Sequence, residues 1–139
     1  MPSIYSVISS DPIRVDVLRD AVAAEAYGAL VVFEGVVRNH DGGRAVTELE
    51  YQVHPDAQAF LDQIAQTLAQ ANPDTTIAIQ HRFGLLTIGD VAFAAAVSST
   101  HRDRAFEVCA EVVNVVKAEL PIWKRQQFED GTHEWVNFA

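Results

Sequence analysis

The chain contains 139 residues, 49% of them apolar and 21% charged, a composition typical of one globular domain spanning residues 1–139. Its 10 basic and 19 acidic residues give a formal net charge of −9, which argues against non-specific nucleic-acid binding and against a polybasic membrane anchor. A single cysteine, Cys109, excludes an internal disulfide and a thiolate zinc site. The N-terminus does not resemble a secretory signal, and no apolar run reaches about 18 residues, so we expect a cytoplasmic protein outside the membrane.

The first elements follow from apolar alternation and from helix-start signals. Residues 4–9 alternate and predict a short strand. A helix is then expected from Asp11, as N-cap, and Pro12, at the first helical position, to about Ala26. The β-branched run over 29–37 predicts a buried strand.

The next segment contains a loop, a strand and a second helix. Gly35 is the candidate position of a bulge in the preceding strand, and residues 38–44 are rich in turn residues. Alternation resumes over 46–53, and Pro55 opens a helix that ends near Asn72. The core positions expected for this helix are Ala59, Phe60, Ile64 and Leu68.

The second half of the chain is again mixed. Strands are expected over 75–83 and 91–99, with residues 84–90 as a connection. A final hairpin is formed by 122–128 and 134–138. Because helices and strands are interspersed, the sequence predicts a single α+β domain with a mixed, mainly antiparallel sheet.

A third helix runs from Ser99-Thr100 to about Leu120. Thr100 as N-cap and Asp103 three residues later resemble a capping box. Cys109 lies on the apolar stripe of this helix, which indicates a packed core thiol rather than a nucleophile. The full stripe is Ala105, Cys109, Val112, Val113 and Val116.

The start of this helix is a candidate anion site. His101 and Arg102 occupy its first two positions, where free backbone N–H groups and the helix dipole favour negative charge. Arginine adds a planar fork suited to phosphate. The alternative is a surface pair whose arginine meets an acidic side chain. Elsewhere, no set of histidine and carboxylate residues has a spacing that indicates a metal site.

Lys117 and Lys124 are the only lysines in the chain, and apolar residues lie between them. We expect both to line a partly desolvated pocket, where burial lowers a lysine's pKa toward neutral pH and suits it to general-base or nucleophilic chemistry. The positive charge of the neighbouring Arg125 is expected to lower the pKa of these lysines as well. The alternative is that two lysines fall in one segment by chance. Arg38 follows a buried strand in a glycine-containing loop, a common place for ligand contacts.

Taken together, these segments resemble the large, catalytic subunit of molybdopterin synthase. The resemblance extends from residue 28 to Val136. It rests on five blocks: Gly28 to His40, His81 to Gly84, Gly89-Asp90, Ser99 to Arg102, and Lys117 with Pro121 to Arg125.

The resemblance implies an α/β hammerhead fold and a sulfur transfer reaction. Cyclic pyranopterin monophosphate would become molybdopterin by dithiolene formation in molybdenum cofactor biosynthesis. The sulfur would arrive as a thiocarboxylate on the C-terminal Gly-Gly tail of a small ubiquitin-like subunit, with no cofactor of the chain's own. Lys117 and Lys124 would be catalytic, and the substrate-binding residues would be Val37, Arg38, His101, Arg102, Arg125 and Gln126.

Two other functions remain open at this point. A non-enzymatic module that docks a ubiquitin-like tail needs the groove but no lysine chemistry. A small dimeric α+β thioesterase needs a carboxylate or asparagine aimed at a thioester, for which Asp103 and Glu107 are the candidates near the cluster.

Helix length adds a further expectation. His101 and Lys117 lie sixteen residues apart in sequence on one expected helix, or about 24 Å at 1.5 Å per residue, too far for one small substrate to touch both. We therefore predict a homodimer with two shared sites, each combining the lysines of one copy with His101 and Arg102 of the other. With the small subunits, the assembly would be a heterotetramer.

Overall fold

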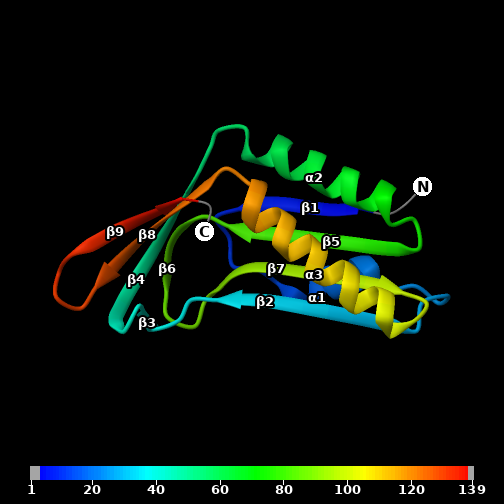
Figure 1. The fold of residues 1–139 in the computed structure, drawn as a ribbon, viewed down its shortest axis with the longest axis horizontal. Coiled ribbons are helices and arrows are strands. Elements are labelled where there is room, and N and C mark those ends of the chain that lie inside the picture. The colour runs from blue at the N-terminus through cyan, green and yellow to red at the C-terminus, as the bar shows by residue number, and fades with distance from the viewer. Residues whose placement is uncertain (1–3, 138–139) are drawn as a thin grey trace.

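The computed structural model describes residues 4–137, in which helices are interspersed among strands along the chain (Figure 1). In chain order the elements are β1 (Ile4–Ser9), α1 (Val15–Val22), β2 (Ala29–Val36), β3 (His40–Asp41), β4 (Arg44–Val53), α2 (Ala57–Ala71), β5 (Thr75–Arg82), β6 (Gly84–Thr87), β7 (Val91–Ser99), α3 (Arg102–Glu119), β8 (Ile122–Phe128) and β9 (His133–Asn137). The predicted α+β class is confirmed. Among residues 4–137, no helix is long and apolar enough to cross a membrane.

A four-stranded sheet in the order β1-β5-β7-β2 is covered on both faces. Figure 1 shows α2 and α3 in front of it and α1 behind it. Alternation along β5 explains the layers: Ile77 and Ile79 pack in the core beneath α2 and α3, whereas Ala78 packs against Leu18 and Val22 of α1. The alanine on that side leaves room for α1 to approach the sheet closely. Within this sheet β1 and β5 run parallel and the other neighbours antiparallel, as the mixed, mainly antiparallel prediction required.

The remaining strands form a second sheet, which is a correction to the single sheet predicted from the sequence. Its order is β3-β4-β8-β9, with β6 also paired to β4, and all its pairs are antiparallel. Strand β6 lies in the segment 84–90, which was expected to be only a connection. Gly84 has a φ of 99°, a value that L side chains rarely adopt, and here the chain leaves β5 and enters β6. Gly42 and Gly43, with φ of 56° and 78°, close the β3–β4 hairpin within the predicted loop 38–44.

The predicted first helix is too long at both ends. Helix α1 begins at Val15, with Arg14 as N-cap, rather than at Asp11-Pro12. The backbone N–H of Asp11 donates instead to the hydroxyl of Ser9, which keeps this residue in the turn after β1. At the other end, the hydroxyl of Ser98 donates to the carbonyl of Val22, the last helical residue.

Helix α2 is rotated relative to the prediction. Its buried stripe contains Ala57, Leu61, Ile64, Ala65, Leu68 and Ala69. Ile64 and Leu68 were predicted correctly, but Ala59 is exposed and the Phe60 side chain is 48% exposed. The helix packs on β1 and β5 through the face that begins at Ala57, so the aromatic ring at position 60 points away from the core.

The N-cap of helix α3 lies one residue later than predicted, at His101 instead of Thr100. His101 makes no side-chain capping hydrogen bond, so the predicted Thr100–Asp103 capping box is wrong. Strand β7 continues to Ser99, whose hydroxyl donates to the Asp74 carbonyl, and this leaves Thr100 in the turn. The buried stripe includes Cys109, as predicted, and Val108, which the prediction missed, whereas Val113 is only partly buried.

Two smaller predictions also have outcomes. The register between β2 and β7 shifts between Gly35 and Val36, which confirms the predicted bulge. The final hairpin is formed by β8 and β9, and Phe138, expected at its end, lies outside the described residues.

Candidate active site

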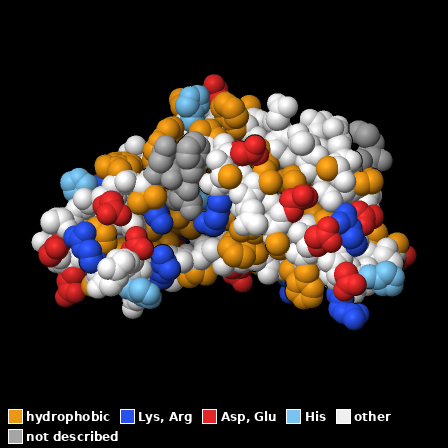
Figure 2. All heavy atoms as spheres, in the orientation of Figure 1, with side chains coloured by type: hydrophobic (Ala, Val, Ile, Leu, Met, Phe, Trp, Pro, Cys, Tyr) orange, Lys and Arg blue, Asp and Glu red, His pale blue; other side chains and the backbone are white. Residues whose placement is uncertain are grey.

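A cavity of about 320 Å³ lies where the two sheets meet. Its walls come from the end of β2 and the residues after it, from β4, β7 and β8, and from the last turn of α3. The lining residues that carry the argument below are Val37, Arg38, Tyr51, Lys117, Lys124 and Gln126. In the orientation of Figure 1, Lys and Arg side chains gather over the part of the molecule built by β4, β8 and β9 (Figure 2).

The cavity brings Lys117 and Lys124 together from two different elements. Lys117 extends from the last turn of α3, with its Nζ 5.8 Å from the centre of the Phe93 ring. Lys124 projects from β8, opposite Tyr51 of β4. Burial lowers the pKa of both amines, and the positive charge of Arg38 lowers both further. The structure thus shows both lysines lining one cavity, as predicted, with Lys124 half-buried and Lys117 more exposed to solvent.

Val37 and Arg38 reach the cavity because a turn fixes the end of β2. The N–H of Val37 donates to the Asp90 carbonyl at 2.9 Å, and the Val37 carbonyl accepts from the N–H of Gly89 at 2.8 Å. The side chain of Asp90 in turn lies 3.6 Å from Arg82. The Gly89-Asp90 turn thus anchors the backbone just before Arg38, whose side chain stays about two-thirds exposed beside the cavity.

Alternation along β8 separates the three polar residues predicted there. Lys124 and Gln126 share the face that lines the cavity, whereas Arg125 lies on the opposite face and does not line it. Gln126 is buried, and its Nε2 donates to Asp41 at 2.7 Å and to Glu134 at 3.4 Å. The structure therefore places Gln126 at the cavity and Arg125 outside it.

Three aromatic side chains lie at the base of the site. His81 and Phe93 stack with ring centroids 5.4 Å apart, and Tyr51 meets His81 edge to face at 5.0 Å. Nδ1 of His81 lies 2.8 Å from the Arg82 carbonyl, so this nitrogen carries the hydrogen. Burial lowers the pKa of His81 to about 4 and raises the pKa of Tyr51 to about 12, so both are neutral at pH 7.

His101 and Arg102 do not reach the cavity within one chain. They lie at the N-terminal end of α3, which runs without interruption from Arg102 to Glu119, whereas Lys117 lies in its last turn. At 1.5 Å per residue the two ends are separated by about 24 Å. The expectation of one unbroken helix is confirmed, and with it the separation of the two basic groups.

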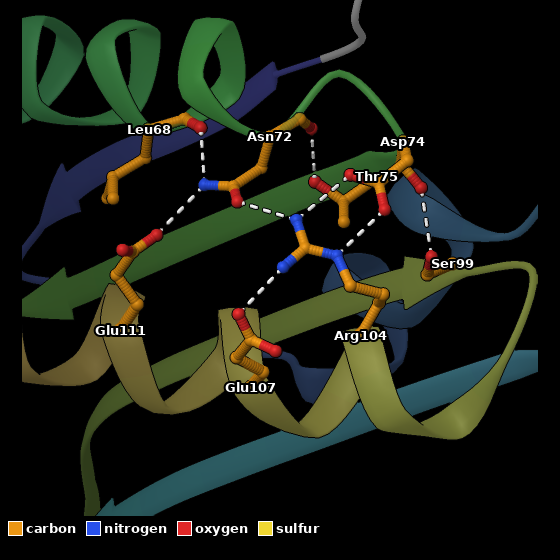
Figure 3. A network of polar contacts seen from close by, with 8 residues as sticks. All are labelled: Leu68, Asn72, Asp74, Thr75, Ser99, Arg104, Glu107 and Glu111. Carbon is orange, nitrogen blue, oxygen red and sulfur yellow. Dashed lines mark hydrogen bonds and ion pairs between the residues drawn. The ribbon is translucent and has the colours of Figure 1, made fainter.

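Arg104, in the first turn of α3, has partners within the chain (Figure 3). Its guanidinium donates to both carboxylate oxygens of Asp74, at 2.8 and 3.1 Å, to Oδ1 of Asn72 at 2.8 Å and to Glu107 at 2.8 Å. The amide of Asn72 also donates to Glu111, so α2, α3 and the turn before β5 are joined. Arg104 therefore ties the start of α3 to the neighbouring elements.

Within one chain, this network argues against the thioesterase alternative. Glu107 is bonded to Arg104, and Asp103 lies in the exposed first turn of α3, far along the helix from the lysines. Neither carboxylate lines the cavity. In the described part of the chain, no group of three or more His, Cys, Asp or Glu side chains is arranged to hold a metal ion.

Sequence reasoning missed the aromatic base and Asp41. The alternation over 46–53 indicates only that Tyr51 lies in a strand, and His81 stands in the sequence only within one of the blocks of resemblance. The glycines that follow Asp41 indicate a loop, so the sequence gives no sign that this carboxylate lies at the cavity. The alternation of Leu49 and Tyr51 along β4 was the available signal, because it places both on one face.

Comparisons with known proteins identify the family of the chain. A family model described as MoaE protein matches residues 8–119. The molybdopterin synthase catalytic subunit of Nostoc sp. is 34% identical over 134 residues, which cover 95% of this chain and 81% of the relative. The subunit of the same name from Staphylococcus carnosus is 38% identical over 130 residues, covering 93% and 86%.

Solved structures extend the likeness to the fold. Molybdopterin synthase from Staphylococcus aureus superposes with a TM-score of 0.85 at 36% identity, covering 98% of both chains. A complex of subunits 1 and 2 of the molybdopterin-converting factor from Helicobacter pylori has a TM-score of 0.71 at 17% identity, covering 97% of this chain and 89% of that one, which shows the fold alone. With its cavity lysines and a family match over most of its length, the chain belongs to the MoaE family of molybdopterin synthase catalytic subunits.

Proposed function

We propose that this chain catalyses sulfur transfer to cyclic pyranopterin monophosphate, forming the dithiolene of molybdopterin in molybdenum cofactor biosynthesis. The observation that carries the proposal is the cavity in which both lysines of the chain meet. The reaction joins an anionic sulfur donor to a phosphate-bearing substrate, so it needs positive charge and proton transfer at one place. The Lys117–Lys124 cavity combines both on a chain whose net charge is −9.

Lowered lysine pKa values suit the chemistry. A lysine amine that is partly neutral near pH 7 accepts a proton, and in its charged form it stabilises negative charge developing on oxygen or sulfur. For each of the two sulfurs, the thiocarboxylate sulfur bonds to a carbon of the substrate, and water then cleaves the acyl–sulfur bond, which leaves a carboxylate on the donor. Both steps require proton transfer. Lys117 and Lys124 are the titratable groups at the cavity whose pKa values are shifted toward that range.

The sulfur would come from a second protein. With one cysteine, buried on α3, the chain has no exposed thiol of its own to carry sulfur. We therefore infer a small ubiquitin-like subunit whose thiocarboxylated C-terminal tail enters the cavity, and no further cofactor. The Helicobacter pylori structure that shares this fold is a complex of subunits 1 and 2 of the molybdopterin-converting factor, which supports a partner subunit. The reaction would take place in the cytoplasm.

A second copy of the chain would complete each site. Strand β2 is an edge strand, and no strand among residues 4–137 pairs with its outer edge. Beside it, a groove between β2 and α3 is lined mostly by apolar residues, and Phe106 on α3 is 62% exposed. A two-fold dimer across this face would run two α3 helices past each other and bring His101 and Arg102 of one copy to the lysines of the other. Arg38 and the partner's arginine would then share the substrate phosphate. With two small subunits the assembly is a heterotetramer.

The test is reconstitution. The purified chain is incubated with a thiocarboxylated small subunit and cyclic pyranopterin monophosphate, and the dithiolene product is detected after conversion to a fluorescent derivative. The double variant Lys117→Arg, Lys124→Arg separates catalysis from docking, because arginine keeps the charge but does not exchange protons near pH 7. We expect the variant to bind the small subunit and to form no product. Equal product from both proteins would contradict the proposal and favour a module that only docks the tail.

A further inference from the structure

Asp41 connects two residues of the cavity that come from different parts of the chain. One carboxylate oxygen accepts from Nη2 of Arg38 at 3.3 Å, and the other accepts from Nε2 of Gln126 at 2.7 Å. Asp41 itself lies in β3, a two-residue strand held by the tight Gly42-Gly43 hairpin. Its side chain is about one-third exposed, so it stands at the rim rather than in the core.

The bonds to Gln126 fix the direction of its amide. Nε2 of Gln126 points toward the carboxylates of Asp41 and Glu134, and this side chain is buried on the same face of β8 as Lys124. The hydrogen bond from Gln126, and the positive charges of Lys124 and Arg38, lower the pKa of Asp41. Asp41 is therefore a carboxylate throughout the neutral range.

Charged and titratable groups face Lys124 from five elements or segments. They are Asp41 on β3, Glu134 on β9, Arg38 after β2, Lys117 on α3 and the neutral phenol of Tyr51 on β4. Burial lowers the pKa of Lys124 and Arg38 adds to that effect, whereas Asp41, and then Glu134, oppose it. Of the two carboxylates that raise the pKa of Lys124, Asp41 has the larger effect.

We propose that Asp41 is a positioning residue of this site: its carboxylate holds Arg38 and Gln126 at the cavity and keeps the Lys124 amine charged. This inference rests on the proposed function, because the charge on Lys124 matters only if the cavity binds an anionic donor and an anionic substrate. An ammonium group at Lys124 attracts the anionic sulfur donor and the substrate phosphate, whereas a neutral amine does not. Asp41 thereby extends to higher pH the range over which the cavity accepts anions.

The first experiment measures the charge of Lys124 directly, with no reaction involved. Lys117 and Lys124 are the only lysines in the sequence, so lysine-selective ¹³C labelling gives two side-chain signals. The variant Lys117→Arg assigns each signal to its residue. We expect Asp41→Asn, which removes the charge and preserves the shape, to move the titration midpoint of Lys124 to lower pH. Asp41→Glu should keep the midpoint near that of the unmodified chain. The matched control is Asp130→Asn, since Asp130 is bonded to Arg44 and Thr132 instead.

The second experiment follows kcat/KM against pH in the reconstituted reaction. In Asp41→Asn we expect the alkaline limb to move to lower pH, with a rise in KM that exceeds the fall in kcat. A merely structural role would lower activity evenly at every pH. An unchanged Lys124 midpoint in folded Asp41→Asn, or a shift no larger than that of Asp130→Asn, would overturn the inference. If the unmodified chain forms no product while the midpoint still shifts, the proposed function fails and the electrostatic role of Asp41 stands.

Discussion

The imidazole of His81 and the phenyl ring of Phe93 lie nearly parallel, with an interplanar angle of 12° and centroids 5.4 Å apart. The Phe93 ring in turn lies beneath the Lys117 amine, so a neutral imidazole supports the base of the cavity. Burial, which leaves the imidazole little solvent, and the nearby charge of Lys117 lower the pKa of His81 to about 4. A charged imidazole at this position would add a cation beneath two lysines.

This depressed pKa makes stability depend on pH. In the unfolded chain the His81 imidazole, with a pKa of about 6.5, binds a proton at a pH where the folded chain does not. Acidification therefore favours unfolding. The contribution is fully present above pH 6.5 and is lost as the pH falls toward 4, a change on the order of 3 kcal/mol. The free energy of unfolding, measured with urea at pH values across this range, should change much less with pH in His81→Gln than in the unmodified chain. The exposed His133→Gln is the control and should keep the pH dependence of the unmodified chain. The same pH dependence in both variants would contradict this account.

Replacing either cavity lysine should abolish most turnover. In Lys117→Ala and Lys124→Ala we expect losses of about 10²- to 10⁴-fold, the usual effect of removing an acid–base group. Neither lysine belongs to the buried core, so thermal unfolding should change little. The measurement is initial rate in the reconstituted reaction beside a melting curve. Near-normal rates in both variants would show that the lysines are not catalytic.

Cys109 should affect stability but not chemistry. The thiol is buried on the stripe of α3, and burial raises its pKa, so it is a poor thiolate. Cys109→Ala should lower the free energy of unfolding by about 1 kcal/mol and leave sulfur transfer intact. Urea denaturation and the product assay check the two parts separately. A folded but inactive variant would mean that sulfur passes through this residue.

Shared sites predict complementation between two inactive variants. Arg102→Ala and Lys117→Ala homodimers should each be nearly inactive if one copy supplies the arginine and the other the lysine. After subunit exchange in equal amounts, about half the dimers are mixed, each with one intact site. About a quarter of normal activity should return, for independent sites. Should the exchanged mixture remain as inactive as its parents, both groups must serve a single chain.

The Arg104 network should matter more than an ordinary surface ion pair. Arg104→Ala leaves Asn72 and Asp74 without the guanidinium that joins α2 to α3, and we expect a lower melting temperature. Arg14→Ala is the control, because Arg14 meets only Asp16, two residues along the chain, and both side chains are largely exposed. Equal melting temperatures for the two variants would mean that the network adds nothing beyond a local pair.

Element types could be predicted from sequence because local signals and tertiary packing agree along most of the chain. The run 91–99 is buried on both faces, so its apolar continuity indicated a strand that the structure confirms. Helix starts were less predictable. Asp11-Pro12 has the residues of a cap, but the Ser9 hydroxyl binds the Asp11 N–H and holds it in a turn. A tertiary or neighbouring bond of this kind leaves no periodic signal.

The same distinction applies to the candidate site: patterns within one segment could be predicted from the sequence, whereas contacts between segments could not. Lys117 and Lys124 were predictable because two lysines among ten basic residues, separated by apolar positions, are unusual. Asp41 and His81 were not, because their roles depend on contacts between distant segments: Asp41 reaches Gln126 across the second sheet, and His81 stacks on a strand that begins ten residues later. The outward direction of Arg125 follows from strand alternation, a test that the resemblance alone did not apply.

The parallel pairing of β1 with β5 has a consequence for the order of folding. Ile4 lies opposite Ile77, and α1, β2, the β3–β4 hairpin and α2 all occur between the two strands in sequence. As the chain leaves the ribosome, β1 emerges long before its partner, and closing so large a loop carries a high entropic cost. The antiparallel β5–β7 unit forms across a short connection, so it provides the template on which β1 docks. Strand β1 is thus synthesised before the other three strands of its sheet but is among the last to join it, and until then it is exposed to wrong pairing with other nascent chains.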